Sequence, residues 1–310
     1  MKQPPTPRHF LDISALDSKT LRRIIDTAHA MKKAGKRVPV KLRPKGIEDD
    51  VLVMIFEKPS TRTRVSFDIA MRQLGGTALS LNHTDLQLGR GESLADTARV
   101  LSRYASAIMI RANSHETLLD LARYGSIPVV NGLTDKSHPC QIMADIQTFE
   151  EHLGNIKGRT VAYVGDGNNV AVSWMHAAVR FGFTLRLGCP DQLKPEDEAV
   201  EWVRTEKGAV TITSDPEKAV RGADCVVTDT WVSMGQSDAA KRKKLLAPYA
   251  VDSALMSRAA KGAIFMHCLP AYREYEVTEE VLEGPQSVVF DEAENRLHAQ
   301  KAILAWCLGA

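Results

Sequence analysis

The sequence has few cysteines, little net charge and no long apolar run, and each shortage excludes a class of protein. Its five cysteines are odd in number and form no C-x-x-C pair, which favours a reduced compartment over a disulfide-linked fold. The net charge of +2 is too small to indicate binding to nucleic acid or to an anionic membrane surface. No apolar run approaches the roughly 18 residues of a transmembrane helix, and the first ten residues lack a signal-peptide core. We therefore expect a cytoplasmic protein with neither nucleic acid nor a membrane as partner.

What the sequence does have is enough length and apolar content for a large core. It runs to 310 residues, of which 44% are hydrophobic, and it shows no internal repeat. This length is compatible with one large or two medium domains.

The most informative stretch is a predicted strand, turn and helix in the first quarter of the chain. The apolar run at 51–56 predicts a buried strand, and apolar residues at helical spacing over 67–74 predict a helix. Ser60 or Thr61 is a suitable N-cap, and Gly75 is a suitable residue to end the helix.

The first turn of this predicted helix is cationic. Arg62 and Arg64 stand where acidic residues would complement the positive end of the helix dipole, and each is unfavourable by about 0.3–1 kcal/mol. Free backbone N–H groups, three hydroxyls and two guanidiniums converge on this turn, a combination that suits phosphate. A solvated basic turn is the alternative, although it has no need of the interleaved hydroxyls.

Helix and strand patterns alternate along the first half. The predicted elements are a helix from 18 to about 35, strands at 51–56, 107–110 and 127–130, and helices around 61–74, 94–101, 114–124 and up to about 152. Such alternation implies parallel strands with right-handed crossovers, and ligands then gather beyond the carboxyl ends of the strands. The Ser60 turn, Arg111 and His138 fall at those ends, so we expect them to share one crevice.

The second half repeats this α/β pattern with different chemistry. Its predicted strands are 160–164, 184–187, 210–213, 225–228, 263–266 and 288–290. The loops after them carry Asn169, Asp229, Cys268 and Arg296, and the final helix at 302–308 is expected to return to the first domain. The predicted fold is α/β, with two open parallel-sheet domains facing a cleft and linked by interdomain helices.

Two segments of the second half invite a different reading. The loop from Gly165 to Val170 resembles a dinucleotide-binding G-x-G-x-x-G, but Val170 replaces the third glycine and two asparagines occupy the place where a pyrophosphate approaches. Its amides suit a small polar ligand better. The basic run at 241–244 is interpreted as a solvated helix face.

Three motifs together carry a family resemblance. STRTR at 60–64, HPCQ at 138–141 and HCLP at 267–270, in this order and spacing, look like a transcarbamylase. The segment DTWVSMG at 229–235 is similar to the ornithine carbamoyltransferase branch, and the match spans essentially the whole chain. The first motif is shared with aspartate transcarbamylases, so the ornithine assignment depends on the last two.

The resemblance implies a role for each matching residue. Those implied to bind carbamoyl phosphate are Ser60, Thr61, Arg62, Thr63, Gln87, Arg111, His138, Gln141, Cys268, Leu269 and Arg296. Those implied to bind ornithine are Asn169, Asp229, Ser233 and Met234. Those implied to act in catalysis are Arg111, His138, Asp229 and Cys268. Gln87 matches a residue that in this family reaches the phosphate of a neighbouring subunit, which implies a homotrimer or a multiple of trimers.

The implied reaction is carbamoyl transfer from carbamoyl phosphate to the δ-amine of L-ornithine, giving citrulline and phosphate. No metal or other cofactor is expected, because arginines supply the positive charge and no metal-ligand spacing occurs. The implied domains are a carbamoyl phosphate-binding domain of residues 1–138 plus 297–310 and an ornithine-binding domain of residues 139–296.

Three alternatives stay open. A relative acting on N-acetylornithine or another amine would share much of the first domain, although the carboxylate of Asp229 suits a free α-amine better. A nicotinamide-dependent oxidoreductase would use the Gly165 loop. A non-catalytic sensor of a phosphorylated metabolite would keep the Ser60 turn but would need neither Asp229 nor Cys268.

Overall fold

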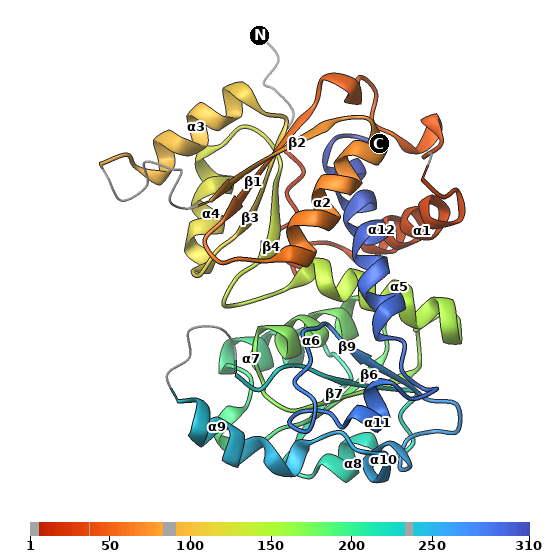
Figure 1. The fold of residues 1–310 in the computed structure, drawn as a ribbon. Coiled ribbons are helices and arrows are strands. Elements are labelled where there is room, and N and C mark those ends of the chain that lie inside the picture. Colours follow the sequence, from red (N-terminus) through yellow and green to blue (C-terminus); the bar gives the residue numbers. More distant parts are fainter. Residues whose placement is uncertain (1–5, 37, 83–90, 233–237) are drawn as a thin grey trace. The chain divides into compact units, whose positions relative to one another are not determined.

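The chain divides into two compact units, each built on one parallel sheet (Figure 1). A computed structural model describes residues 6–36, 38–82, 91–232 and 238–310. Unit 1 comprises the chain up to Ala144 together with Arg296–Ala310, and unit 2 is Asp145–Asn295. Both divisions lie inside helices rather than after residues 138 and 296 as the sequence predicts, so Arg296 belongs to unit 1. The parallel α/β class is confirmed, and the cleft stays a prediction.

Unit 1 has a four-stranded sheet in the order β2-β1-β3-β4. Its strands are β1 (Val51–Phe56), β2 (Thr77–Asn82), β3 (Ala107–Arg111) and β4 (Val129–Leu133). Its helices are α1 (Ser18–Lys33), α2 (Thr61–Leu74), α3 (Leu94–Tyr104) and α4 (His115–Tyr124), with short 3-10 turns at Val40–Leu42 and Ile47–Asp49. Figure 1 shows α3 and α4 on one side of this sheet and α2 on the other. The sheet therefore changes winding direction between β1 and β3, the place where ligands bind in open α/β sheets.

The predicted strand, turn and helix around Ser60 are confirmed. The Ser60 hydroxyl caps α2 by accepting from the Thr63 amide at 3.4 Å. Gly75 ends the helix with a φ of 117°, a left-handed conformation that favours glycine.

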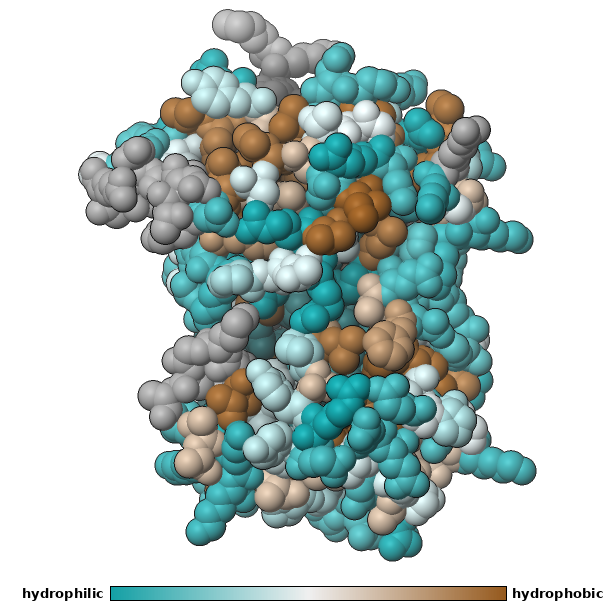
Figure 2. Space-filling model, viewed as in Figure 1, coloured by the Kyte–Doolittle hydropathy of each residue, from teal (hydrophilic) through white to brown (hydrophobic). Residues whose placement is uncertain are grey.

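Strand β2 has no counterpart in the sequence prediction. It pairs with β1 at the edge of the sheet, and it alternates exposed and half-buried residues rather than forming an apolar run. Figure 2 shows apolar side chains on the viewed face of unit 1 over β2 and α2, where Leu79, Val65 and Ile69 are exposed.

Unit 2 has a five-stranded sheet in the order β7-β6-β5-β8-β9. Its strands are β5 (Thr160–Val164), β6 (Thr184–Gly188), β7 (Val210–Thr213), β8 (Cys225–Thr228) and β9 (Ile264–His267). Its helices are α6 (Asn169–Phe181), α7 (Asp197–Thr205), α8 (Pro216–Val220), α9 (Ala239–Leu246), α10 (Ser253–Met256) and α11 (Glu279–Leu282), with 3-10 turns at Asp191–Leu193 and Ala247–Tyr249. Here the winding direction changes between β5 and β8.

Two helices carry the chain from one unit to the other. They are α5 (Pro139–Leu153) and α12 (Val289–Cys307). The predicted strand at 288–290 is wrong, because Ser287 makes the bridge to Phe265 and α12 begins at Val289. Asp291 and Glu292 complement the dipole in its first turn, and this signal outweighs the strand propensity of the preceding apolar residues. Among the described residues, none of the helices is long and apolar enough to cross a membrane.

Candidate functional site

In unit 1, polar side chains gather at the carboxyl ends of β1, β3 and β4. The amide of Glu57, just after β1, donates to the carbonyl of Arg111 at the end of β3, which holds these two exits together. Thr63 is buried in the first turn of α2. Arg64, by contrast, turns toward β2, where it donates to Ser80 and to Asn82 and stacks on Phe56. Of the two arginines expected at the anion site, Arg64 is therefore directed to β2, and Arg62 is the guanidinium of this turn that stays a candidate for the anion.

His138 lies at the exit from β4 and is buried. Burial lowers the pKa of this imidazole well below its usual value, and the charges of Arg296, Arg111 and Arg62 lower the pKa further. The shared crevice stays a prediction, although these residues come from four separate segments of unit 1 and Arg62, Arg111 and Arg296 lie near His138. His138 is consequently neutral at pH 7, a form in which one ring nitrogen carries a proton to donate.

Arg296 reaches this group from α12. Its guanidinium donates to Gln141 at 2.7 Å and to Thr63 at 3.2 Å, so it connects the first turns of α5 and α2. The Gln300 amide satisfies its neighbours when its nitrogen faces Ser66 and its oxygen faces Arg296. In this orientation the oxygen accepts from Nη2 and Nε of Arg296 at 2.7 and 3.0 Å. Arg296 was expected from a loop of the second domain, and it is instead a buried helix residue of unit 1.

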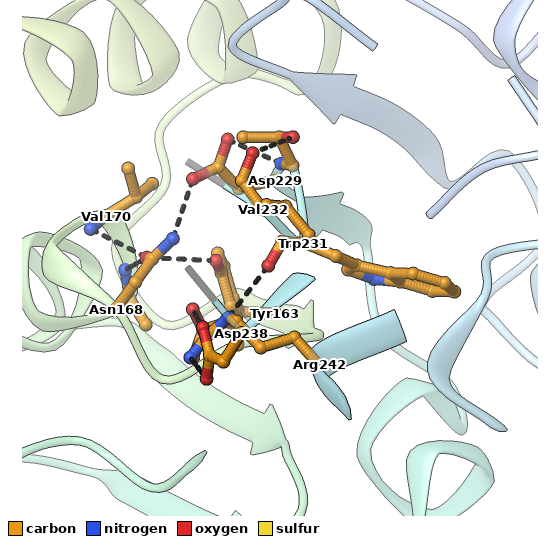
Figure 3. A network of polar contacts seen from close by, with 11 residues as sticks. Tyr163, Asn168, Val170, Asp229, Trp231, Val232, Asp238 and Arg242 are labelled. Carbon is orange, nitrogen blue, oxygen red and sulfur yellow. Dashed lines mark hydrogen bonds and ion pairs between the residues drawn. The ribbon is translucent and has the colours of Figure 1, made fainter. Parts of the chain in front are cut away.

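In unit 2, Asp229 accepts hydrogen bonds at the carboxyl end of β8 (Figure 3). One of its oxygens accepts from Asn168 Nδ2 at 2.8 Å. The other accepts from the Thr230 amide at 2.7 Å and from the Cys268 thiol at 3.1 Å. The carboxylate thus joins the loops after β5, β8 and β9, which are the loops that the sequence places at this edge.

Asn168, the residue before the predicted ornithine-binding residue Asn169, is the asparagine that contacts Asp229. Its Oδ1 accepts from the amides of Val170 and Ala171 and from the Tyr163 hydroxyl, while its Nδ2 donates to Asp229 (Figure 3). Asn169 is instead the first residue of α6. The contact between Asn168 and Asp229 is not predicted from the sequence, and the role of Asn169 in binding ornithine stays a prediction.

The Gly165 loop does not have the features of a dinucleotide site. The helix N-terminus that would receive a pyrophosphate is capped by Asn168 itself. At Gly167, a side-chain Cβ would lie 2.4 Å from the carbonyl oxygen of Leu193, so this glycine allows close chain packing. Both observations weigh against a dinucleotide site, and the small polar ligand stays a prediction.

Cys268 is held as a neutral thiol. Burial raises its pKa well above the ordinary value, and the negative charges of Asp229 and Glu292 raise the pKa further. Leu269 adopts a φ of 54°, and its amide donates to Nδ1 of His267 at 2.9 Å. His267 Nε2 lies 3.3 Å from Glu276, which fixes the imidazole and, through it, the backbone beside Cys268.

Asp229, His267 and Cys268 also place potential metal ligands near one another. Their ligand atoms lie within 4.8 Å of one another. In this arrangement, however, Nδ1 of His267 accepts from a backbone amide and Nε2 faces a carboxylate. A metal would have to displace one of these contacts and take the proton from a thiol whose pKa is raised. The donor set therefore fits a hydrogen-bonded network better than a metal centre.

Three predicted residues, Gln87, Ser233 and Met234, lie outside the described residues. Trp231 is buried and packs in the interior of unit 2.

Family models match both halves of the chain. Residues 8–151 match the carbamoyl-P binding domain of the aspartate/ornithine carbamoyltransferases, and residues 157–307 match their Asp/Orn binding domain. The chain belongs to the aspartate/ornithine carbamoyltransferase family. The first matched range holds the arginines around His138 apart from Arg296, and the second holds Asp229 and its partners.

Relatives within this family are similar over nearly their whole length. An ornithine carbamoyltransferase of Rhodopseudomonas palustris (strain ATCC BAA-98 / CGA009) is 60% identical over 304 residues, covering 98% of this chain and 97% of that protein. One of Agrobacterium fabrum is 56% identical over 304 residues, covering 98% and 99%. Among solved structures, the ornithine carbamoyltransferase of Pyrococcus furiosus has a TM-score of 0.90 at 47% identity, covering 97% of this chain and 96% of that one.

Proposed function

We propose that this protein transfers the carbamoyl group of carbamoyl phosphate to the δ-amine of L-ornithine, giving L-citrulline and phosphate. The observation that carries the proposal is the buried Asp229 carboxylate, oriented by Asn168 and Cys268 at the winding switch of unit 2. A carboxylate in that place pairs with a free α-ammonium group, whereas an acylated amine has no charge to offer. The similarity to enzymes named ornithine carbamoyltransferase supports the same substrate.

Unit 1 is proposed to bind carbamoyl phosphate. The phosphate lies at the N-terminus of α2, where Ser60, Thr61, Arg62 and Thr63 offer hydroxyls, backbone amides and a guanidinium. Arg111, His138 and Gln141 contact the carbamoyl group, and Gln87 is proposed to reach the phosphate of a neighbouring subunit. Arg296 acts mainly by holding Gln141 and Thr63.

Polarisation of the carbonyl is the first catalytic contribution. Arg111 and the neutral imidazole of His138 donate to the carbonyl oxygen, where negative charge develops as an amine attacks. One such donor is typically worth about 3–4 kcal/mol in the transition state. Because burial and then the neighbouring guanidiniums lower the pKa of His138, it serves as a donor without adding its own positive charge to those of the arginines.

The amine is the second requirement. A lysine-like amine has a pKa of about 10.4, so presenting it unprotonated at pH 7 costs about 4.6 kcal/mol. We propose that Asn169, Asp229, Ser233 and Met234 bind the α-amino and α-carboxylate groups. Cys268 and the Leu269 backbone then lie next to the reacting groups.

The protonation state of Cys268 restricts its role. A thiol with a raised pKa is protonated at pH 7, so it cannot accept the amine's proton as a thiolate would. The thiol donates its hydrogen to the Asp229 carboxylate, and its sulfur can still accept a hydrogen bond from another group. Because Asp229 is already paired with the α-ammonium group in this proposal, the proton that the attacking δ-amine loses as the C–N bond forms goes to the departing phosphate.

Three further features are part of the proposal. The reaction is proposed to serve arginine biosynthesis or a urea-cycle-type step, and a cytoplasmic location is proposed because the cysteines are unpaired. A homotrimer or a multiple of trimers is proposed because Gln87 matches the residue that in this family reaches a neighbouring subunit; the apolar side chains of Val65, Ile69 and Leu79 are exposed on α2 and β2, where a subunit interface could cover them.

The test is a citrulline assay with carbamoyl phosphate and one amine at a time, namely ornithine, N-acetylornithine, putrescine or aspartate. Product from ornithine alone is the expected result. Product from another amine alone would retain the roles of unit 1 and remove the assignments around Asp229. No product with any amine would leave a sensor that binds the phosphorylated metabolite.

A further inference from the structure

Arg242 is a buried cation in a helix segment whose sequence suggests solvent exposure. It lies in α9 within the run KRKK, yet its side chain is 10% exposed. It forms an ion pair with Asp166, whose side chain is equally buried. Its Nε donates to the carbonyl of Trp231 at 3.1 Å, and its Nη1 lies 4.0 Å from Asp238 (Figure 3).

These contacts join two of the three loops that build the Asp229 network, those after β5 and β8. Asp166 belongs to the same loop as Asn168, and both follow β5. Trp231 stands two residues after Asp229, in the loop that follows β8. One guanidinium therefore bridges the loop that carries the Asn168 amide and the loop that carries the carboxylate accepting from it.

The burial of this pair is costly and calls for a reason. Removing two charges from water is unfavourable for each ion, and a buried ion pair is often no more stabilising than apolar residues of similar volume. The planar guanidinium does, however, offer donors in a fixed geometry, which apolar residues cannot reproduce. Its value here lies in fixing the spacing of two loops.

We propose that Arg242, together with Asp166, is a positioning residue for the amine substrate. It holds the loops after β5 and β8 at the distance at which the Asn168 amide donates to the Asp229 carboxylate. This inference rests on the proposed function, because it takes Asp229 as the group that pairs with the α-amine of ornithine.

The protonation of Asp166 adds a signature to this role. Burial raises the pKa of Asp166 to about 6, although the Arg242 charge opposes the shift. The charged groups that face it are Arg242 and Asp238 from the α9 region and Asp229 from the loop after β8. Above pH 6 the ion pair is complete, and below pH 6 a proton on Asp166 weakens it. The KM for ornithine should therefore gain an extra rise as pH falls through about 6.

The experiment compares Arg242→Gln with Lys244→Gln, an exposed lysine of the same helix that undergoes the same change of charge. Loss of a charged hydrogen-bond partner predicts a KM for ornithine raised about tenfold or more in Arg242→Gln. The KM for carbamoyl phosphate should change less than about twofold, and kcat should fall less than the KM rises. Lys244→Gln should behave as the wild type.

Two further variants keep the test decisive if Arg242→Gln does not fold. Arg242→Lys retains the charge but loses the forked geometry, so it should show an intermediate KM for ornithine. Asp166→Asn should raise this KM at pH 8 and abolish the extra rise near pH 6, while the change caused by protonation of the substrate amine persists.

The outcomes separate the two proposals. Wild-type protein that forms citrulline, with folded Arg242 and Asp166 variants whose KM for ornithine stays within twofold, would overturn the positioning role alone. Wild-type protein that forms no citrulline would overturn the proposed function, and this inference with it.

Discussion

Replacing Asp229 by asparagine removes a charge while keeping the shape of the side chain, and the surrounding hydrogen bonds allow its effect to be worked out. In one orientation of the new amide, its NH₂ group would face the Asn168 NH₂ group at about the present 2.8 Å. Asn168 cannot rotate to relieve this, because its oxygen already accepts from the amides of Val170 and Ala171. In the other orientation, the NH₂ group would face the Thr230 amide, now at 2.7 Å.

Either orientation therefore leaves a donor facing a donor. An unsatisfied buried group costs about 1–3 kcal/mol, and the lost pairing with a substrate ammonium is worth about 1.5–3 kcal/mol. At 1.4 kcal/mol per tenfold, the second term alone predicts a KM for ornithine raised by about 10- to 150-fold in Asp229→Asn. The unsatisfied buried group predicts that the free energy of unfolding of unit 2 falls by about 1–3 kcal/mol in the same variant.

The assay is citrulline formation at varied ornithine and saturating carbamoyl phosphate, with urea unfolding of the same preparations. Asp191→Asn is the matched control, because that carboxylate is exposed in the same unit and pairs with Lys194. The KM for carbamoyl phosphate should be unchanged in both variants. A folded Asp229→Asn protein whose KM for ornithine lies within twofold of the wild type would refute the assignment.

Three other predictions concern single groups. Arg62→Gln should raise the KM for carbamoyl phosphate by about tenfold or more with the KM for ornithine retained, because it removes a guanidinium from the proposed phosphate site; an unchanged value in steady-state kinetics would contradict that site. Cys268 should react slowly with iodoacetamide at pH 7.5 and faster in Asp229→Asn, because burial and then the Asp229 charge raise its pKa; peptide mapping measures the label, a Cys268→Ala variant gives the background, and equal rates would argue against the coupling. Burial lowers the pKa of Lys301 to about 8, so between pH 8 and 10 the unfolded chain binds more protons at this site than the folded chain. The wild type should then gain stability relative to Lys301→Met as pH rises through about 8 in urea titrations, and a constant difference would contradict the shift.

Features coded by neighbouring residues could be predicted from the sequence. The helix after Ser60 has its cap, its apolar stripe and its closing Gly75 within one short segment, and all three are present in the structure. Arg111, His138 and Asp229 could be placed at strand ends because a parallel sheet brings its carboxyl ends to one edge.

Features that depend on distant partners could not. The sequence around Arg242 suggests a surface residue, because its ion-pair partner Asp166 lies 76 positions away in the chain. Arg296 follows an apolar run that resembles a strand, yet Ser287 makes only an isolated bridge to Phe265 and α12 begins at Val289. The edge strand β2 has too few buried residues to show an apolar pattern, since its pairing with β1 supplies the order.

The return of α12 to unit 1 has a consequence for the order of folding during synthesis. Unit 2 is continuous in sequence, whereas unit 1 needs the segment Arg296–Ala310, whose Ala299, Ile303 and Leu304 are fully buried. On the ribosome, which adds about 5–20 residues per second, the second unit can therefore complete its core before the first, although it is made later. A chain stopped shortly before Arg296 should leave unit 1 unable to close while unit 2 is nearly whole.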